Sequence, residues 1–139
     1  MAREIWILRH DDAEPSGPGG DGARRLTPAG EAHAAALGRS LSARGLRAAR
    51  VLSSPLARAR RTAEIVAGGV EVEIDPRLAP GRDAPGAAAA ALAEGPWPVL
   101  LVGHNPDLEM LVIALTGTAV PMGKGAFVRI DQGRVLERA

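Results

Sequence analysis

The strand predictions come from short apolar segments and from one stretch of alternating polarity. Residues 4–8 (EIWIL) and 99–102 (VLLV) are nearly continuous apolar runs, which is typical of strands that are buried on both faces in a parallel sheet. Residues 50–53 (RVLS) predict a further short strand. Residues 70–74 alternate apolar and acidic side chains, so they predict an exposed strand at the edge of the sheet.

Helix signals fill the intervals between these strands. The predicted helices cover residues 27–45, 54–67, 87–93 and 106–115. The first opens with Thr27-Pro28 and the second with Ser54-Pro55, and each pair places a capping residue before a proline, which is favoured in the first helical turn. The third segment is rich in alanine and follows a predicted loop at 78–86.

The order of these elements predicts the fold class. Strands alternate with helices along most of the chain, so we expect an α/β protein with three α/β/α layers and a largely parallel sheet. Residues 126–130 and 135–137 flank an Asp-Gln-Gly turn and predict a hairpin. The length suits one domain, 1–139, and the glycine- and proline-rich residues 15–22 predict a loop.

The composition narrows the classes of function. The formal net charge is +1 and 2% of the residues are aromatic, so we expect neither a general attraction to nucleic acid nor a surface that stacks bases. The chain has no cysteine, which excludes a thiolate nucleophile and a cysteine-bound metal. Charges interrupt the first ten residues and no apolar run approaches the roughly 20 residues of a membrane span, so we expect a cytoplasmic protein without membrane contact.

Polar residues of an unusual kind follow three of the predicted strands. These junctions are Arg9-His10, Ser53-Ser54-Pro55 with Arg58 in the next helix, and Gly103-His104-Asn105. Sites in open α/β sheets form beyond the carboxyl ends of the strands, so we expect these residues to converge. Two arginines and two histidines beside helix N-termini form an anion site, and a neutral histidine ring can also attack phosphorus.

Each of these residues has a simpler explanation when it is taken alone. Arg9-His10 is compatible with an exposed loop pair, His104 with a capping role and Arg58 with a solvated position in an arginine-rich helix. We interpret His33, in the middle of the first predicted helix, as structural. The combination, with each member at its own junction, is what favours a phosphate site.

Taken in order, the motifs resemble those of the histidine phosphatase superfamily, also called phosphoglycerate mutase-like. The segments that carry the resemblance are RHD at 9–11, LTPAG at 26–30, SPLAR at 54–58, TAE at 62–64 and VGHN at 102–105. The resemblance extends from Ile5 to about Gly117. The opening LRHDDA and the approach Arg24-Arg25 to the first helix are most similar to the SixA-type phosphohistidine phosphatases.

This resemblance implies roles for the residues at the junctions. It makes His10 the nucleophile, which carries the phosphoryl group before water receives it. Arg9, Arg58 and His104 are implied to hold the phosphoryl oxygens. Because these residues supply the positive charge, the resemblance implies neither a metal nor another cofactor.

Further roles are implied less directly. Arg24, or Arg25 beside it, is expected to be a substrate-side arginine, and Asn105 of the last motif a substrate-binding residue. The family glycine after the nucleophile is Asp11 here, and a carboxylate that pointed into the site would disfavour an anionic substrate. Asp11 and Asp83 are candidates for a general acid, and weaker ones are Asp12 and Asp21.

Several functions remain open from the sequence. The leading one is hydrolysis of phosphohistidine on a histidine-containing phosphotransfer protein, because an imidazole leaves phosphorus more easily than an alkoxide and needs no strong acid. The alternatives are a phosphatase for a small phosphoester and a non-catalytic module that binds phosphate or phosphopeptides. A mutase is disfavoured, because a chain of this length has little extra structure to retain a bound intermediate.

Overall fold

The computed structural model describes residues 2–15 and 18–139. Its strands are β1 (Ile5–Arg9), β2 (Arg50–Ser53), β3 (Val72–Ile74), β4 (Val99–Gly103), β5 (Phe127–Asp131) and β6 (Arg134–Arg138). Its α-helices are α1 (Pro28–Ala43), α2 (Ala57–Val66), α3 (Ala84–Glu94) and α4 (Asp107–Thr116), and its short 3-10 helices are η1 (Asp21–Ala23) and η2 (Pro76–Leu78). Within the described ranges, no helix is both long enough and apolar enough to cross a membrane.

The strands form one mixed sheet in the order β3-β2-β4-β1-β5-β6. The first four of these strands are parallel, whereas β5 runs antiparallel to both β1 and β6. The largely parallel sheet, the edge position of the third strand and the terminal hairpin are all confirmed. The hairpin turns at Gln132-Gly133, where both residues have the positive φ that a tight turn of this kind requires.

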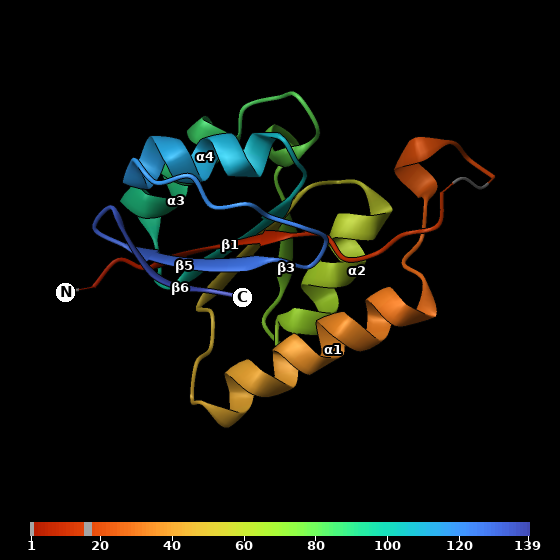
Figure 1. The fold of residues 1–139 in the computed structure, drawn as a ribbon, viewed down its shortest axis with the longest axis horizontal. Coiled ribbons are helices and arrows are strands. Elements are labelled where there is room, and N and C mark those ends of the chain that lie inside the picture. The colour runs from red at the N-terminus through yellow and green to blue at the C-terminus, as the bar shows by residue number, and fades with distance from the viewer. Residues whose placement is uncertain (1, 16–17) are drawn as a thin grey trace.

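Helices cover both faces of the sheet and complete the three layers (Figure 1). Along β1, Ile5 and Ile7 point toward α3 and α4, while Trp6 and Leu8 point toward α1 and α2, because successive side chains of a strand face opposite sides. Trp6 meets Phe127 edge to face, with ring centres 5.6 Å apart. The continuous apolar run at the start of the chain thus belongs to a central strand with a core on each side.

Two helix boundaries differ from the expectation. α2 begins at Ala57 rather than at Ser54-Pro55, because the Ser54 Oγ accepts the Leu56 N–H at 3.2 Å and bends the chain before the helix. α3 begins before residue 87, because the Asp83 carboxylate caps its N-terminus by accepting the Gly86 N–H at 3.0 Å. Residues 16 and 17 of the predicted loop 15–22 lie outside the described residues. The last two residues of that predicted loop, 21 and 22, belong to η1.

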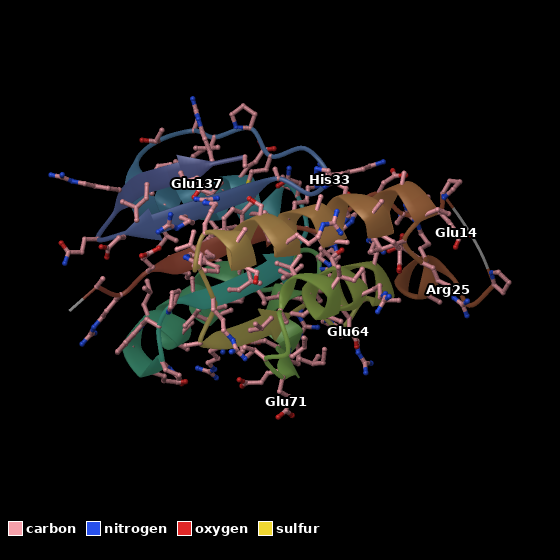
Figure 2. All side chains as sticks on the ribbon, turned by 90° about the horizontal axis from the view of Figure 1, so that it is seen from below. Glu14, Arg25, His33, Glu64, Glu71 and Glu137 are labelled. Atoms are coloured by element: carbon pink, nitrogen blue, oxygen red, sulfur yellow. The ribbon has the colours of Figure 1, made fainter. Side chains whose placement is uncertain are left out.

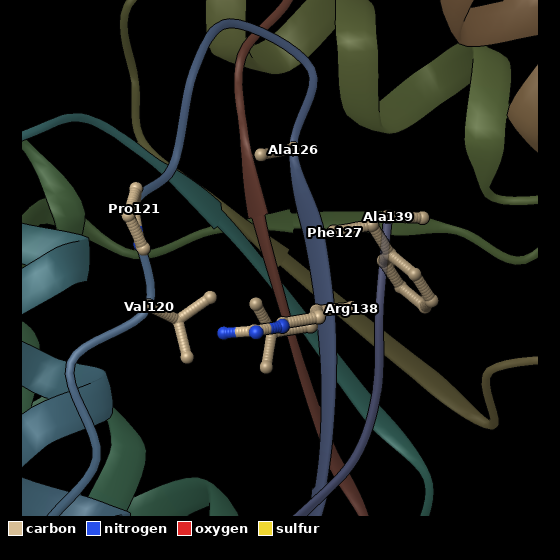
Figure 3. A pocket seen from close by; sticks show the side chains of 7 residues that line it. Val120, Pro121, Ala126, Phe127, Arg138 and Ala139 are labelled. Carbon is tan, nitrogen blue, oxygen red and sulfur yellow. The ribbon is translucent and has the colours of Figure 1, made fainter.

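A surface cavity of about 290 Å³ lies beside the β5–β6 hairpin (Figure 3). Its walls come from Val120 and Pro121 on one side and from Phe127, Arg138 and Ala139 of the hairpin on the other. The predicted site residues do not line it. The cavity and the chemistry expected from the sequence are therefore separate features of the fold.

Candidate active site

The polar junctions of the sequence meet at one end of the sheet. β1, β4 and β2 are neighbours, and their carboxyl ends are aligned by the register of the sheet. Just beyond these ends, the His10 N–H donates to the Gly103 carbonyl at 3.1 Å and the Ser54 N–H donates to the Val102 carbonyl at 3.0 Å. The rings of His10 and His104 have their centres 5.1 Å apart. The predicted convergence of these segments is therefore observed.

His10 is a buried histidine whose tautomer is defined by its neighbours. Burial is the main cause that lowers the pKa of His10 to about 4; its hydrogen bond to the Asp11 carbonyl opposes this shift, and the charges of Arg58 and Arg9 add to it. The Nδ1 atom lies 2.8 Å from the Asp11 carbonyl oxygen, and since a carbonyl only accepts, Nδ1 carries the proton. The lone pair is therefore on Nε2, which accepts from the Arg58 Nε–H at 3.4 Å. At neutral pH this nitrogen is unprotonated, and it can act as a nucleophile once Arg58 turns to a ligand.

Arg58 lies between His10 and the carboxylate of Asp21. Its Nη1 donates to the Asp21 carbonyl at 2.9 Å and its Nη2 to the Asp21 carboxylate at 3.3 Å. Arg24 donates to the same carboxylate at 3.1 Å, and this hydrogen bond, together with the charge of Arg58, holds the pKa of Asp21 below its usual value. The structure thus brings Arg24 to the cluster, whereas Arg25 is exposed at the edge of the molecule (Figure 2).

The Asp21 contacts have a chemical consequence. Its carboxylate already engages the guanidinium groups of Arg58 and Arg24, which are the groups that match phosphate oxygens in geometry and charge. A lowered pKa keeps Asp21 ionised at neutral pH, which does not suit a general acid. Asp21 therefore competes with an anionic ligand for the two arginines.

His104 is a second buried and neutral histidine. Burial, followed by the charges of His10 and Arg58, lowers its pKa to about 3. Its Nε2 lies 2.7 Å from the Ser54 Oγ, which already accepts the Leu56 N–H. We assign the hydroxyl proton to the hydrogen bond with Nε2, and the single proton of the neutral ring then lies on Nδ1. The Nδ1 atom is buried and has no hydrogen-bond partner among the described residues.

Arg9 offers a similar buried donor. Its Nη1 donates to the Met122 carbonyl at 3.1 Å, which anchors the guanidinium, while its Nε is buried without a partner within the described chain. Unpaired buried donors are rare, and each is a place for an acceptor. Arg9 also lowers the pKa of both buried histidines through its charge. Arg9 thus adds positive charge near His10, and His104 places a second buried ring beside it.

Asn105 is held by hydrogen bonds within the protein. Its side-chain amide donates to the Glu109 carboxylate at 2.6 Å and to the Met122 carbonyl at 2.7 Å. Glu109 in turn accepts the Met122 N–H at 3.1 Å. The amide protons of Asn105 are therefore used to fix the same Met122 carbonyl that anchors Arg9. The sequence carries no local signal for Glu109 or Met122 in this arrangement.

The two carboxylates proposed as general acids are also engaged by the protein. Asp11 is buried, and its carboxylate accepts from His33 Nδ1 at 2.7 Å and from the Asp12 N–H at 3.1 Å. Asp83 caps α3, and none of its hydrogen bonds goes to His10, Arg58 or His104. His33, interpreted from the sequence as structural, is the partner of Asp11. In the described part of the chain, no group of three or more His, Cys, Asp or Glu side chains is placed to hold a metal ion.

Comparison with known sequences assigns the chain to a family. Residues 5–80 match the family model of the histidine phosphatase superfamily (branch 1). An uncharacterised protein of Picosynechococcus sp. is 34% identical to the chain, and the match covers 94% of this chain and 86% of that protein.

Comparison with solved structures gives the same family and a branch within it. The protein histidine phosphatase SixA, solved in complex with tungstate, has a TM-score of 0.86 and 27% identity over 97% of this chain and 95% of its own. The protein described as the phosphohistidine phosphatase SixA of Agrobacterium tumefaciens has a TM-score of 0.84 and 26% identity over 100% of this chain and 98% of its own. A phosphoserine phosphatase of Entamoeba histolytica shares the fold, with a TM-score of 0.75 and 13% identity over 98% of this chain and 96% of its own.

Proposed function

This chain belongs to the histidine phosphatase superfamily, in its SixA-type branch, and is a phosphatase; on that basis we propose that it hydrolyses phosphohistidine on a phosphotransfer protein. The observation that carries the proposal is the state of His10. Its ring is buried and neutral, its Nδ1 proton is held by the Asp11 carbonyl, and its Nε2 lone pair lies beside the Arg58 guanidinium. These are the properties of a histidine that attacks phosphorus.

In the first step the phosphoryl group of the substrate binds beside His10. Arg58 turns its guanidinium from the Asp21 carboxylate to the phosphoryl oxygens, and the free N–H groups of Arg9 and His104 donate to them. His10 Nε2 then forms a bond to phosphorus while the bond from phosphorus to the substrate nitrogen breaks. The leaving imidazole keeps the electron pair of that bond and takes a proton from solvent.

In the second step water hydrolyses the phosphorylated His10. The water oxygen forms a bond to phosphorus, the bond to His10 Nε2 breaks, and the electron pair returns to the ring as inorganic phosphate leaves. The donors on Arg9, Arg58 and His104 stabilise the charge on the equatorial oxygens in both steps once Arg58 has turned to the phosphoryl group. We propose that these donors stabilise the transition state without a metal ion.

The environment of the carboxylates supports a substrate with a phosphorus–nitrogen bond. The carboxylates of Asp11 and Asp83 are held by hydrogen bonds within the protein, and Asp21 stays ionised at neutral pH. An alkoxide leaving group needs protonation by a well-placed acid, whereas an imidazole is a much better leaving group. A protein that bears phosphohistidine is therefore the partner that this site favours, and the cytoplasm, where such phosphotransfer proteins act, is the compartment we propose.

The experiment that tests this proposal compares two substrates. The parent, His10→Ala and an exposed control variant on α1, Arg39→Ala, are assayed in EDTA with a phosphorylated histidine phosphotransfer protein and with p-nitrophenyl phosphate. We expect rapid loss of phosphate from the protein substrate and slow turnover of the ester. We expect His10→Ala to lower the rate on the protein by at least about a thousandfold, because loss of a catalytic nucleophile has effects of this order.

The other outcomes identify the alternatives. Activity of His10→Ala within about tenfold of the parent would refute His10 as the nucleophile. Faster turnover of the ester than of the phosphoprotein would mean a phosphatase for small phosphoesters with an acid still to be found. Binding of phosphate without turnover of either substrate would mean a non-catalytic binding module.

A further inference from the structure

We propose that Asp11 and His33 form a positioning pair that holds the peptide carbonyl on which His10 depends. This inference rests on the proposed role of His10 as the nucleophile. It assigns a role to Asp11, which stands where the family motif has glycine, and to a histidine outside the family motifs. Neither side chain touches the reacting atoms, so both act through the main chain of residues 11–12, which carries the Asp11 carbonyl.

The Asp11 side chain is held at both of its oxygens. The residue is 4% exposed, and its carboxylate accepts from His33 Nδ1 at 2.7 Å through one oxygen and from the Asp12 N–H at 3.1 Å through the other. The His33 side chain is 58% exposed and comes from the middle of α1. A buried carboxylate is unfavourable unless it is paired and hydrogen-bonded, so this pair resists rotation of the Asp11 side chain away from α1.

The Asp11 main chain is held as firmly as its side chain. Its N–H donates to the Thr62 Oγ1 of α2 at 3.1 Å, and its carbonyl accepts from His10 Nδ1 at 2.8 Å. The Gly125 N–H donates to the carbonyls of Arg9 and His10, each at 3.1 Å. The segment that carries the nucleophile is therefore fixed from three sides. Gly125, which precedes β5, and Thr62 of α2 hold its main chain, and His33 of α1 holds it through the Asp11 side chain.

Gly125 packs directly against the pair. Its φ is +75°, and a Cβ atom at this position would lie 2.5 Å from His33 Nδ1 and 2.6 Å from Asp11 Oδ2. Figure 2 shows His33 on α1, next to the segment that leads into β5. The hydrogen-bonded pair thus fills the space between α1 and this segment, and a side chain larger than hydrogen at 125 would displace it.

The chemical consequence concerns the tautomer of His10. A carbonyl that is fixed in place accepts the Nδ1 proton and leaves the lone pair on Nε2, where phosphorus is attacked. If the Asp11 peptide can rotate, the proton is shared between Nδ1 and Nε2, and the ring loses its fixed orientation. The pair is therefore expected to act mainly on the rate of the chemical step and much less on the binding of substrate.

The test uses variants of both members and one conservative replacement. His33→Ala removes the donor, whereas His33→Asn keeps an N–H near the position of Nδ1. Asp11→Ala and the double variant complete a cycle, and Arg39→Ala on the exposed face of α1 is the control. Each is assayed for kcat and KM with the phosphoprotein, and thermal unfolding establishes that each is folded.

We expect His33→Ala to lower kcat about tenfold, with KM within about twofold of the parent, because one hydrogen bond to a charged group acts on the rate. His33→Asn should regain most of the loss. The double variant should be no slower than the slower single variant, since the two side chains act as one unit. A kcat of His33→Ala within about twofold of the parent, or losses that multiply in the double variant, would overturn the pair.

A spectroscopic readout separates this inference from the proposed function. The chain has three histidines, so nitrogen NMR of the rings can resolve His10 in the unliganded protein. We expect a single Nδ1–H tautomer of His10 in the parent and in His33→Asn, and a mixture in His33→Ala. An unchanged tautomer in His33→Ala would overturn the pair whether or not the protein is active. If His33→Ala loses the single tautomer but His10→Ala keeps full activity, the role of His10 as the nucleophile is refuted, whereas the positioning of its ring by Asp11 and His33 stands.

Discussion

The burial of His10 predicts a measurable loss of stability in acid. In the folded protein the pKa of His10 is lowered to about 4, mainly by burial, from 6.5 in the unfolded chain. Between these two values the unfolded state binds more protons than the folded state, so the free energy of unfolding falls as the pH falls. The part of the free energy of unfolding that depends on a neutral His10 is intact above about pH 6.5 and is fully lost below about pH 4.

The size of this effect follows from the pKa difference. Lowering the pH from about 7.5 to about 5 is expected to remove about 2 kcal/mol of stability through His10 alone. The perturbation is His10→Asn, which keeps a donor toward the Asp11 carbonyl and does not titrate. Relative to the parent, this variant should lose about 2 kcal/mol less over the same pH interval.

Urea unfolding at several pH values measures this difference. The fluorescence of Trp6, which is buried between the sheet and the α1–α2 layer, reports unfolding, and Arg39→Ala is the control that should keep the parental pH dependence. His104 is buried in the same way, with a pKa lowered to about 3, and because burial is the main cause, His10→Asn retains most of its acid dependence. If the parent and His10→Asn lose the same free energy of unfolding as the pH is lowered, the assignment of His10 as a buried neutral ring is refuted.

Three further changes have expected outcomes. Asp21→Asn should tighten inhibition by inorganic phosphate several-fold, because it removes the carboxylate that competes for Arg58; an inhibition constant that is unchanged or larger would contradict that competition. Ser54→Ala should lower kcat about tenfold, because the hydroxyl orients His104, and steady-state kinetics would show no change if the ring is held by packing alone. Leu101→Ala in β4 should lower the free energy of unfolding by about 3 kcal/mol in urea, because the side chain is fully buried; a loss below about 1 kcal/mol would mean that the core collapses around the gap.

Local signals in the sequence were sufficient for most of the fold. The apolar run at the start of the chain, the capping pair Thr27-Pro28 and the Asp-Gln-Gly turn each specify a local conformation through a few neighbouring residues, and each is found in the structure. The start of α2 was predicted too early, because Ser54 is part of the site and uses its hydroxyl for Leu56 and His104. A capping signal was thus overridden by a tertiary contact.

The composition of the candidate site was also accessible from the sequence. Each motif lies at the end of a strand or in the first turn of the helix that follows it, and the carboxyl ends of parallel strands meet at one edge of a sheet, so Arg9, His10, Arg58 and His104 could be expected together. The order of the motifs along the chain also carried the resemblance to the histidine phosphatases. These inferences need only the direction of the strands and not the details of packing.

Only the tertiary structure decided the partners of the polar side chains. Asp11 pairs with His33, Asp21 with Arg58, and Asn105 with the Met122 carbonyl, in each case across a separation that no helical or strand period describes. The same carboxylate at position 11 could lie toward a phosphate or away from it, and the sequence permits both. The packing of α1 and Gly125 around the Asp11 side chain selects one, because a buried carboxylate settles where a donor meets it.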